Sequence, residues 1–320
     1  MIPNNKLVTI LFKSIAQKRS TAYSDTGKDE LQFTPMADAR FTPQPWGNIH
    51  VDLYSTYSMK TITHHGRETA YRRTDRGGNG PVVLFVHGSG ATGDLWRGQR
   101  SLAERCEVVA LDLSGHGESE DVDVSAGYET LAAYATDVVA VARDVGADIL
   151  VGNSLGGAVV LHVALERGYD PSALVLAGTG AKLAVLDDLL GWLDDDFERA
   201  VEFLHADGRL FYDPDETLRT ASADAMRSVG QEITRRDFRT CHAFDVRERI
   251  GEIETPTLAV YGEHDQLTPP RYHEYLVDEL PDAARASIDD AAHLAMLERP
   301  AAFNAALERF LDELAANGSV

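Results

Sequence analysis

The sequence predicts a three-layer α/β domain with a mainly parallel sheet, and three observations support that prediction. Short, continuously apolar runs recur from residue 81 onward, as is typical of strands that are buried on both faces. Helical stretches separate these runs, which favours parallel strands joined by right-handed crossovers. Residues 182–249 break the alternation with several short amphipathic segments and no convincing strand, which predicts a helical cap inserted between two strands.

The expected elements can be placed in chain order. Two polar-apolar runs flank a Gly-Arg turn and predict a hairpin at 60–65 and 68–74. Apolar runs predict buried strands at 81–86, 106–111, 148–152, 172–178 and 256–262, and a last strand is expected at 284–289. Helices are expected at 130–146 and after Pro300, where Phe303, Leu307, Phe310, Leu311 and Leu314 share one face. The core is therefore expected to comprise 59–181 and 250–320, with the cap at 182–249.

Composition excludes several classes of protein. The apolar fraction of 44% is too high for wholesale disorder. The chain has 30 basic and 51 acidic side chains, and its net charge of -21 repels phosphate backbones and anionic lipid, so neither nucleic acid nor a membrane is an expected partner. Two cysteines, Cys106 and Cys241, are too few for a disulfide scaffold and fit a reducing compartment, so we expect a cytoplasmic protein.

The charged residues are unevenly distributed. After residue 58 the chain has only two lysines, Lys60 and Lys182, against 22 arginines. Such an acidic, lysine-poor composition resembles proteins of halophilic archaea, which keep molar salt in the cytoplasm. At molar salt the Debye length falls to about 3 Å, which removes most of the self-repulsion of an acidic surface.

Residues 1–58 differ in kind from the rest. The apolar run at 7–12 is too short for a membrane span and lacks the features of a signal peptide. No sustained period follows it before Met59. We expect a disordered extension, or upstream sequence translated from a misplaced start, with a targeting arm as a further alternative.

Ser154 is the candidate nucleophile. It lies in the run GNSLG at 152–156, between an expected strand and an expected helix. The glycines permit a sharp turn that presents the hydroxyl at the carboxyl end of the strand, where the N-terminus of the next helix stabilises negative charge. Gly157 allows that helix to pack close to the sheet.

A serine hydroxyl becomes a good nucleophile only when a base removes its proton. His293, in the loop between the last strand and the last helix, is the candidate base. Asp265, just after the strand at 256–262, is the candidate acid that orients the histidine, and Glu263 is the alternative acid.

The loop after the strand at 81–86 is expected to stabilise a developing oxyanion. It reads His-Gly-Ser-Gly at 87–90, and glycine-rich turns leave backbone N–H groups free to point at negative charge. The expected donors are the N–H groups of Ser89 and Leu155, with Gly90 as the alternative to Ser89.

The remaining histidines have no expected catalytic role. His87 is expected to bridge loops structurally, and His116 is expected in a loop at the mouth of the pocket. Because no group of histidines has metal-ligand spacing, the sequence predicts no metal site and no cofactor.

Five motifs, HGSG, DLSGHGES, GNSLGG, GEHD and AAHLAMLERP, occur in this order, and with them the chain resembles the α/β-hydrolase superfamily over residues 60–315. It looks most like capped esterases, lactonases and carbon–carbon bond hydrolases. The resemblance implies an α/β-hydrolase fold and the chain order Ser154, Asp265, His293 for a catalytic triad. Serine at the elbow argues against haloalkane dehalogenases and epoxide hydrolases, which have aspartate there.

The expected function is a carboxylesterase-like serine hydrolase that acts on a small ester-type substrate through an acyl-enzyme. A lactonase or a carbon–carbon bond hydrolase with the same triad is the first alternative. The basic cap residues Arg235, Arg236, Arg239 and His242 could serve such a reaction, but the favoured interpretation of them is the solvated basic face of a cap helix. A catalytically inactive ligand-binding module is the second alternative, although no triad member is missing.

The acidic surface generates a prediction about salt. We expect a higher melting temperature and higher activity in molar potassium chloride than in dilute buffer, because screening reduces repulsion within the compact state. Differential scanning calorimetry across a salt series measures this. A melting temperature that stays flat or falls as salt rises would reject the halophilic interpretation.

Overall fold

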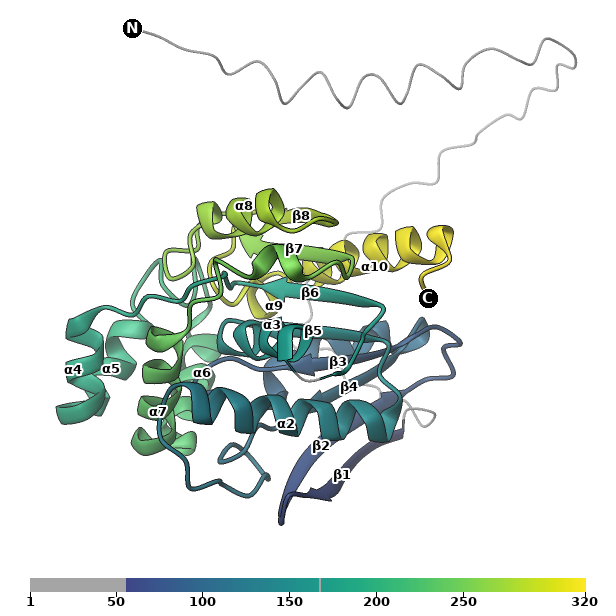
Figure 1. The fold of residues 1–320 in the computed structure, drawn as a ribbon. Helices are drawn as coiled ribbons and strands as arrows, with labels where there is room; N and C mark the ends of the chain where they lie inside the picture. The colour runs from purple at the N-terminus through teal and green to yellow at the C-terminus, as the bar shows by residue number, and fades with distance from the viewer. Residues whose placement is uncertain (1–55, 167) are drawn as a thin grey trace, which may run out of the picture. The chain divides into compact units, whose positions relative to one another are not determined.

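A computed structural model describes residues 56–166 and 168–320, which form an eight-stranded sheet flanked by helices (Figure 1). The strand order is β1-β2-β4-β3-β5-β6-β7-β8. The first two strands form an antiparallel hairpin and β2 pairs antiparallel with β4, whereas all later neighbours are parallel. The sheet thus has the mainly parallel character that its apolar runs predict.

The strands lie within a few residues of their expected positions. They are β1 (Thr56–His64), β2 (Arg67–Asp75), β3 (Val82–Val86), β4 (Glu107–Leu111), β5 (Ile149–Asn153), β6 (Ala173–Ala177), β7 (Thr257–Gly262) and β8 (Ala283–Ile288). The five central strands from β3 to β7 are almost wholly buried, because helices cover both faces of the sheet there.

Strand β1 includes Thr56, Tyr57 and Ser58, which the expected boundary after residue 58 assigns to the extension. Strand β1 begins at Thr56, and its pairing with β2 starts at Thr56 opposite Asp75. Backbone pairing extends the strand beyond the part that the side-chain pattern marks. Residues 1–55 of the expected extension lie outside the described residues.

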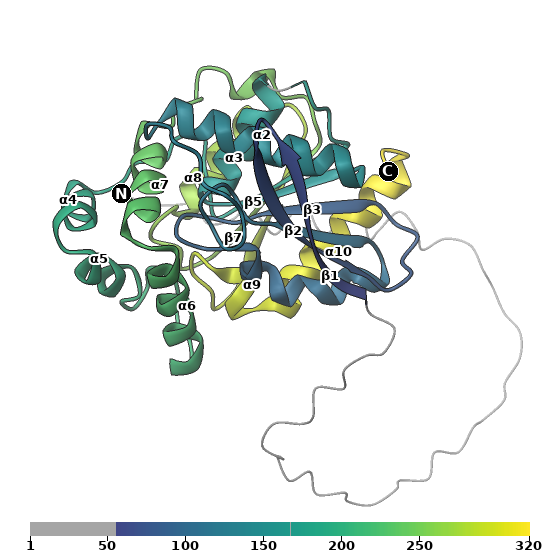
Figure 2. The same cartoon turned by 90° about the horizontal axis from the view of Figure 1, so that it is seen from below.

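Two helical layers enclose the sheet, and alternate residues of each strand point to opposite layers. One face packs against α2 (Tyr128–Val145), α3 (Leu155–Glu166) and α8 (Pro270–Glu279). The other packs against η1 (Gly93–Glu104), α9 (Ala295–Glu298) and α10 (Pro300–Asn317). In β3, for example, Phe85 belongs to the second core and Leu84 to the first. Figure 2, seen from the β1–β2 end, brings the hairpin to the front of these layers.

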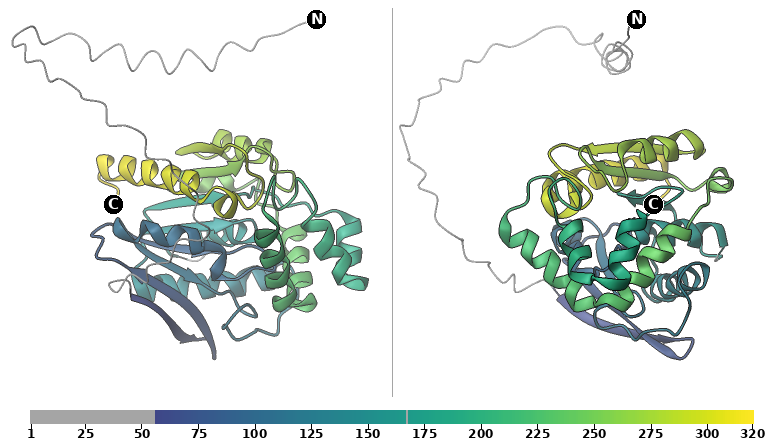
Figure 3. Two further views of the ribbon diagram at one scale, coloured as in Figure 1. Left: turned by 180° about the vertical axis from the view of Figure 1, so that it is seen from behind. Right: turned by 90° about the vertical axis from the view of Figure 1, so that its left-hand side faces the viewer.

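Four helices follow β6 before the chain returns to β7. They are α4 (Asp187–Asp195), α5 (Phe197–Leu204), α6 (Glu216–Val229) and α7 (Gln231–Ala243), and the short η2 (Ile250–Glu252) leads into β7. Figure 3 shows α4 to α7 gathered at one end of the sheet. The only pairing outside named strands that the described residues make is an isolated bridge between Lys182 and Asp245, at the base of this segment. We call residues 182–249 the cap from here on.

Two further features concern the helices. The sequence pattern did not predict η1, whose φ and ψ angles leave the helical range at Trp96, so that its apolar residues do not follow one regular period. Among the helices of the described residues, none is both long and apolar enough to cross a bilayer.

Candidate active site

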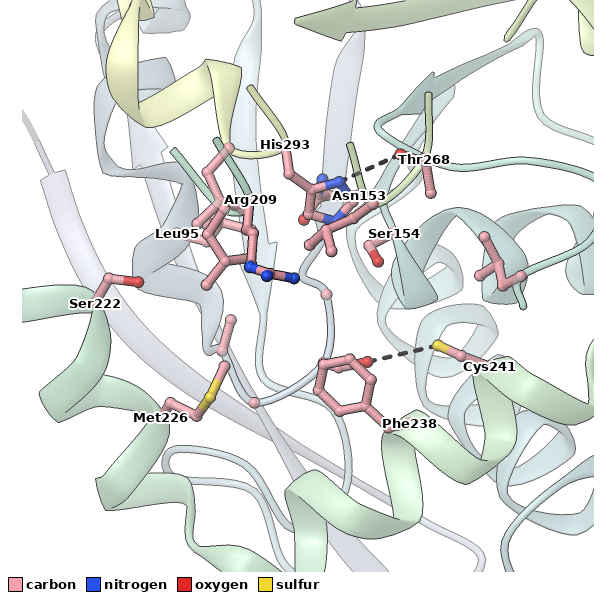
Figure 4. Close-up of a pocket in the computed structure, with 18 of the residues that line it drawn as sticks. Leu95, Asn153, Ser154, Arg209, Ser222, Met226, Phe238, Cys241, Thr268 and His293 are labelled. Atoms are coloured by element: carbon pink, nitrogen blue, oxygen red, sulfur yellow. Dashed lines mark hydrogen bonds between the residues drawn. The ribbon is translucent and has the colours of Figure 1, made fainter. Parts of the chain in front are cut away.

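A cavity of about 500 Å³ lies between the cap and the carboxyl ends of the central strands. The loop after β3, the turn after β5 and the loops after β7 and β8 supply its floor, and α4 to α7 supply its roof. Figure 4 shows Ser154 and His293 at this cavity, with Met226 and Phe238 on the cap helices that face them. The carboxyl ends of parallel strands are where open α/β sheets place their ligand sites.

Ser154 occupies the sharp turn between β5 and α3. Its φ of 53° is in the left-handed region, which costs a non-glycine residue about 1–3 kcal/mol unless the surroundings hold it. Its N–H donates to the Ala177 carbonyl at 3.0 Å, and its carbonyl accepts from the Thr179 hydroxyl at 2.8 Å. The end of β6 and the residues just after it therefore hold the turn in place.

The turn also requires that α3 begins close against β3. A Cβ atom at Gly156 would collide with the carbonyl oxygens of Val86 and His87, and one at Gly157 would lie 2.5 Å from the Thr179 side chain. Glycine is the residue that fits at both positions. The expected close packing of this helix is therefore a feature of the structure.

His293 and Asp265 meet behind the cavity wall. The Nδ1 atom of His293 lies 2.9 Å from the Oδ2 atom of Asp265, and only 5% and 3% of these residues are exposed. The other oxygen of Asp265 accepts the N–H groups of Leu267 and Thr268 at 2.8 and 2.9 Å. Burial acts to raise the pKa of Asp265, but His293 and the hydrogen bonds from Thr268 outweigh it and hold the pKa below its usual value.

Thr268 is a site residue that the sequence reasoning missed. Its hydroxyl donates to Asp265 at 2.7 Å and lies 3.2 Å from the Nδ1 atom of His293. Its position three residues after a candidate acid, in a turn before a proline, was the available signal, since hydroxyl side chains often close such turns.

Glu263, the alternative acid, does not contact His293. Its carboxylate accepts the N–H of Asp290 at 3.1 Å and lies 3.1 Å from the His264 ring. Within the described part of the chain, Glu263, His264 and Asp290 are the one group of three possible metal ligands, and they sit at the exposed to half-buried surface.

Ser89 and Leu155, the expected oxyanion donors, have backbone N–H groups that donate no hydrogen bond within the described residues. Among residues 56–166 and 168–320, no acceptor takes the N–H of Ser89 or of Leu155, and both residues lie beside the cavity or its serine. The N–H of Gly90, by contrast, donates to the Asp237 carboxylate at 3.0 Å. The Gly90 N–H is therefore already engaged, whereas the Ser89 N–H is not.

Asp237 links the cap to the floor of the cavity. It lies on α7 and is fully buried, and besides the Gly90 N–H it accepts the Tyr134 hydroxyl at 2.8 Å and the His116 ring at 2.9 Å. Sequence reasoning missed this residue. The sequence feature that could have indicated it is a row of polar or small residues at helical spacing, Thr234, Asp237, Thr240 and Cys241. In the structure all four are buried on one face of α7.

The sequence suggested that His116 lies in a loop at the mouth of the pocket. In the structure its ring is completely buried against Asp237 instead. Burial acts to lower the pKa of His116. The charge of Asp237 and its hydrogen bond to the ring outweigh this effect, so the pKa is raised above its usual value. Both ring nitrogens contact oxygen atoms, of Asp237 and of the Ser114 carbonyl, which fits a protonated ring.

His87 bridges two loops, as expected. Its Nδ1–H donates to the Gly88 carbonyl at 2.8 Å, and its Nε2 accepts the N–H of Leu113 at 3.0 Å. Burial and the neighbouring His116 lower the pKa of His87 to about 4. The ring is therefore neutral and holds the loop after β3 to the loop after β4.

The four basic cap residues that could have served a carbon–carbon reaction do not line the cavity. Arg235 and Arg239 pair with Asp194 at 3.7 and 2.5 Å, and Arg236 pairs with Asp121 at 2.5 Å. His242 contacts the Val185 carbonyl at 3.2 Å. These side chains face acidic or backbone partners because α7 turns its Asp237 face to the core.

The chain matches the sequence pattern of the alpha/beta hydrolase family over residues 83–306. A 2-hydroxy-6-oxo-6-(2'-aminophenyl)hexa-2,4-dienoic acid hydrolase of Metapseudomonas resinovorans is 28% identical over 82% of this chain and 93% of its own. A pimeloyl-[acyl-carrier protein] methyl ester esterase of Neisseria meningitidis is 28% identical over 72% and 93%. The solved structure of a thermophilic esterase has a TM-score of 0.72 and 30% identity over 81% of this chain and 99% of its own.

The buried neutral histidines generate a prediction about pH. Burial lowers the pKa of both His87 and His273 to about 4, whereas an unfolded histidine titrates near 6.5. The unfolded chain thus binds more protons below pH 6.5, so the free energy of unfolding should fall as the pH falls, by up to about 2 kcal/mol for each histidine near pH 5. His116, with its raised pKa, changes stability only above pH 6.5.

Urea denaturation at constant salt between about pH 5 and 7 measures this slope. His273→Gln is the informative variant, because a glutamine oxygen can still accept the Thr179 N–H that His273 accepts at 3.1 Å. We expect a shallower slope in this variant. Equal stability of the wild-type protein at both ends of the range would refute the assignment.

Proposed function

The chain belongs to the alpha/beta hydrolase family, and we propose that it is a serine hydrolase that cleaves a small ester-type substrate through an acyl-enzyme. One observation supports this above all: Ser154 and His293 open onto the same cavity, and His293 is held from behind by Asp265. We favour an ester over other scissile bonds because similar proteins are named as esterases.

In the first step His293 acts as base. The Asp265 carboxylate accepts the Nδ1–H of His293, which leaves the Nε2 lone pair available to the Ser154 hydroxyl. His293 takes the hydroxyl proton while Ser154 Oγ forms a bond to the carbonyl carbon of the ester. The carbonyl oxygen becomes an oxyanion, which the N–H groups of Ser89 and Leu155 stabilise; one such donor is commonly worth about 3 kcal/mol.

The intermediate then collapses. The bond between the carbonyl carbon and the alcohol oxygen breaks, and His293 returns its proton to the leaving alcohol. A water molecule next gives a proton to His293 and attacks the acyl carbon. The bond to Ser154 breaks, the serine recovers its proton and the carboxylic acid leaves. The sequence of steps calls for no cofactor.

A lactonase or a carbon–carbon bond hydrolase with the same three residues is the second candidate. The relative whose name specifies a hexa-2,4-dienoic acid favours it. Against the carbon–carbon reaction, Arg235, Arg236, Arg239 and His242 are directed to partners outside the cavity. An inactive binding module is disfavoured, because Ser154, Asp265 and His293 are all present, His293 contacts Asp265, and Ser154 and His293 line the same cavity.

The proposed location is the cytoplasm. Cys106 and Cys241 are both free and buried, which fits a reducing compartment.

Removal of any of the three residues should abolish most turnover. We expect Ser154→Ala and His293→Ala each to lower kcat for a chromogenic ester by at least about 10⁴-fold, and the double variant to lose little more, because nucleophile and base act as one unit. Asp265→Asn should cost about 10³–10⁴-fold, because an amide can hold the wrong histidine tautomer.

Glu263→Gln is the matched control, since Glu263 is a neighbouring acid that does not reach His293, and its kcat should stay within about twofold of the wild type. A fluorophosphonate should label the wild type but not Ser154→Ala, with circular dichroism used to verify folding. If Glu263→Gln were severe and Asp265→Asn mild, the acid would be Glu263. Near-normal hydrolysis by Ser154→Ala would contradict the proposed mechanism as a whole.

A further inference from the structure

The charged side chains that line the cavity in front of Ser154 have a net positive charge, opposite in sign to that of the whole chain. The whole chain has a net charge of -21, yet the charged side chains at the cavity, apart from His293, are three arginines and one aspartate: Asp94, Arg97, Arg209 and Arg271. Asp94 is already paired with Arg100 at 2.8 Å. A net positive lining in such an acidic chain concentrates anions at the cavity.

Arg209 is the most buried of the three arginines that line the cavity. It follows α5 in the cap and is half-buried, whereas Arg97 and Arg271 are exposed. Its guanidinium lies over the Phe203 ring at 3.4 Å from the ring centre, and Figure 4 shows it pointing into the cavity on the side where His293 and Ser154 lie.

This guanidinium has no acidic partner among residues 56–166 and 168–320. Other cap arginines are paired: Arg219 with Asp207 at 2.9 Å, Arg227 with Glu198 at 3.0 Å and Arg239 with Asp194 at 2.5 Å. A cation partly removed from water is costly unless an opposite charge compensates it. The planar fork of N–H donors on arginine matches a carboxylate in both shape and charge.

Apolar side chains line much of the cavity that holds Arg209 and Ser154. Leu95, Met226, Phe238 and Leu294 line the cavity, and Figure 4 shows Leu95, Met226 and Phe238 around the guanidinium. A ligand that reaches both ends thus needs a polar reactive group, an apolar spacer and an anionic end.

We propose that Arg209 determines specificity by binding a carboxylate of the substrate, so that the preferred substrates are small esters in which a short apolar spacer separates a free carboxylate from the scissile bond. This inference rests on the proposed function for the identity of the scissile bond. The carboxylate can belong to the acyl half, as in a half-ester of a dicarboxylic acid, or to the alcohol half, and the two arms of the experiment distinguish these.

The test compares charged and neutral esters of the same shape. The acyl arm uses the 4-nitrophenyl half-ester of adipic acid and the matching ester of adipamic acid, in which a carboxamide replaces the carboxylate. The alcohol arm uses the butyrate esters of 4-hydroxybenzoate and 4-hydroxybenzamide. We expect wild-type kcat/KM to favour the carboxylate by at least about tenfold in one of the two arms.

The variants identify the residue responsible. Arg209→Gln should remove the preference by raising KM for the charged ester at least about tenfold, with the neutral ester changed by less than about threefold. Arg209→Lys should recover part of the preference, because it restores the charge without the fork. Arg227→Gln, which removes an exposed cap arginine outside the cavity lining, is the control for net charge and should behave like the wild type.

A binding measurement separates this inference from the catalytic one. Titration calorimetry on Ser154→Ala should show that monomethyl adipate binds at least about tenfold more tightly than dimethyl adipate. Arg209→Gln in that background should abolish this difference in affinity. If no ester is turned over but this difference is found, the hydrolase proposal fails and the carboxylate site stands. Equal kcat/KM for the charged and neutral esters in both arms would overturn the carboxylate site. Where the acyl arm shows the preference, equal binding of the two adipates would overturn it as well.

Discussion

Ser154 occupies the turn between β5 and α3 because the first turn of α3 lies against the end of β3 and the residues after β6 without a side chain in between. Gly156 and Gly157 leave that space, and any Cβ there would meet Val86 or Thr179. Three consequences follow from this close approach. The serine is held at a positive φ, the N–H of Leu155 is left without an acceptor, and both lie beside the loop after β3 that carries Ser89.

The cap is tied to the same loop through a buried charge. Asp237 on α7 holds the N–H of Gly90 next to Ser89, and Tyr134 and His116 from the core complete its hydrogen bonds. Removal of one partner of such a buried pair commonly costs about 3–5 kcal/mol, because the remaining charge has no compensation. The roof of the cavity and the expected oxyanion donor are therefore positioned by one network, and Arg209 enters the cavity from that same roof.

The sequence was most informative where a local pattern has one structural meaning. Buried parallel strands are short apolar runs, so β3 to β7 could be placed almost to the residue, and candidate residues just after them had to meet at one edge of the sheet. The cap was less predictable. Amphipathic spacing shows that α7 has a buried face, but which partner that face meets depends on how the segment returns to β7. The pattern therefore left open whether Arg235, Arg236 and Arg239 face the cavity, which they do not, and it gave no signal for Arg209, which lines it.

The central claim is that the reaction passes through an ester of Ser154. Rapid acid quenching of the protein during turnover of a chromogenic ester, followed by mass spectrometry of its peptides, tests this most directly. We expect the mass of the acyl group on the peptide that contains Ser154, appearing within the first turnover and absent from Ser154→Ala. An acyl group on a different residue, or one that persists in the Ser154→Ala protein, would contradict the account.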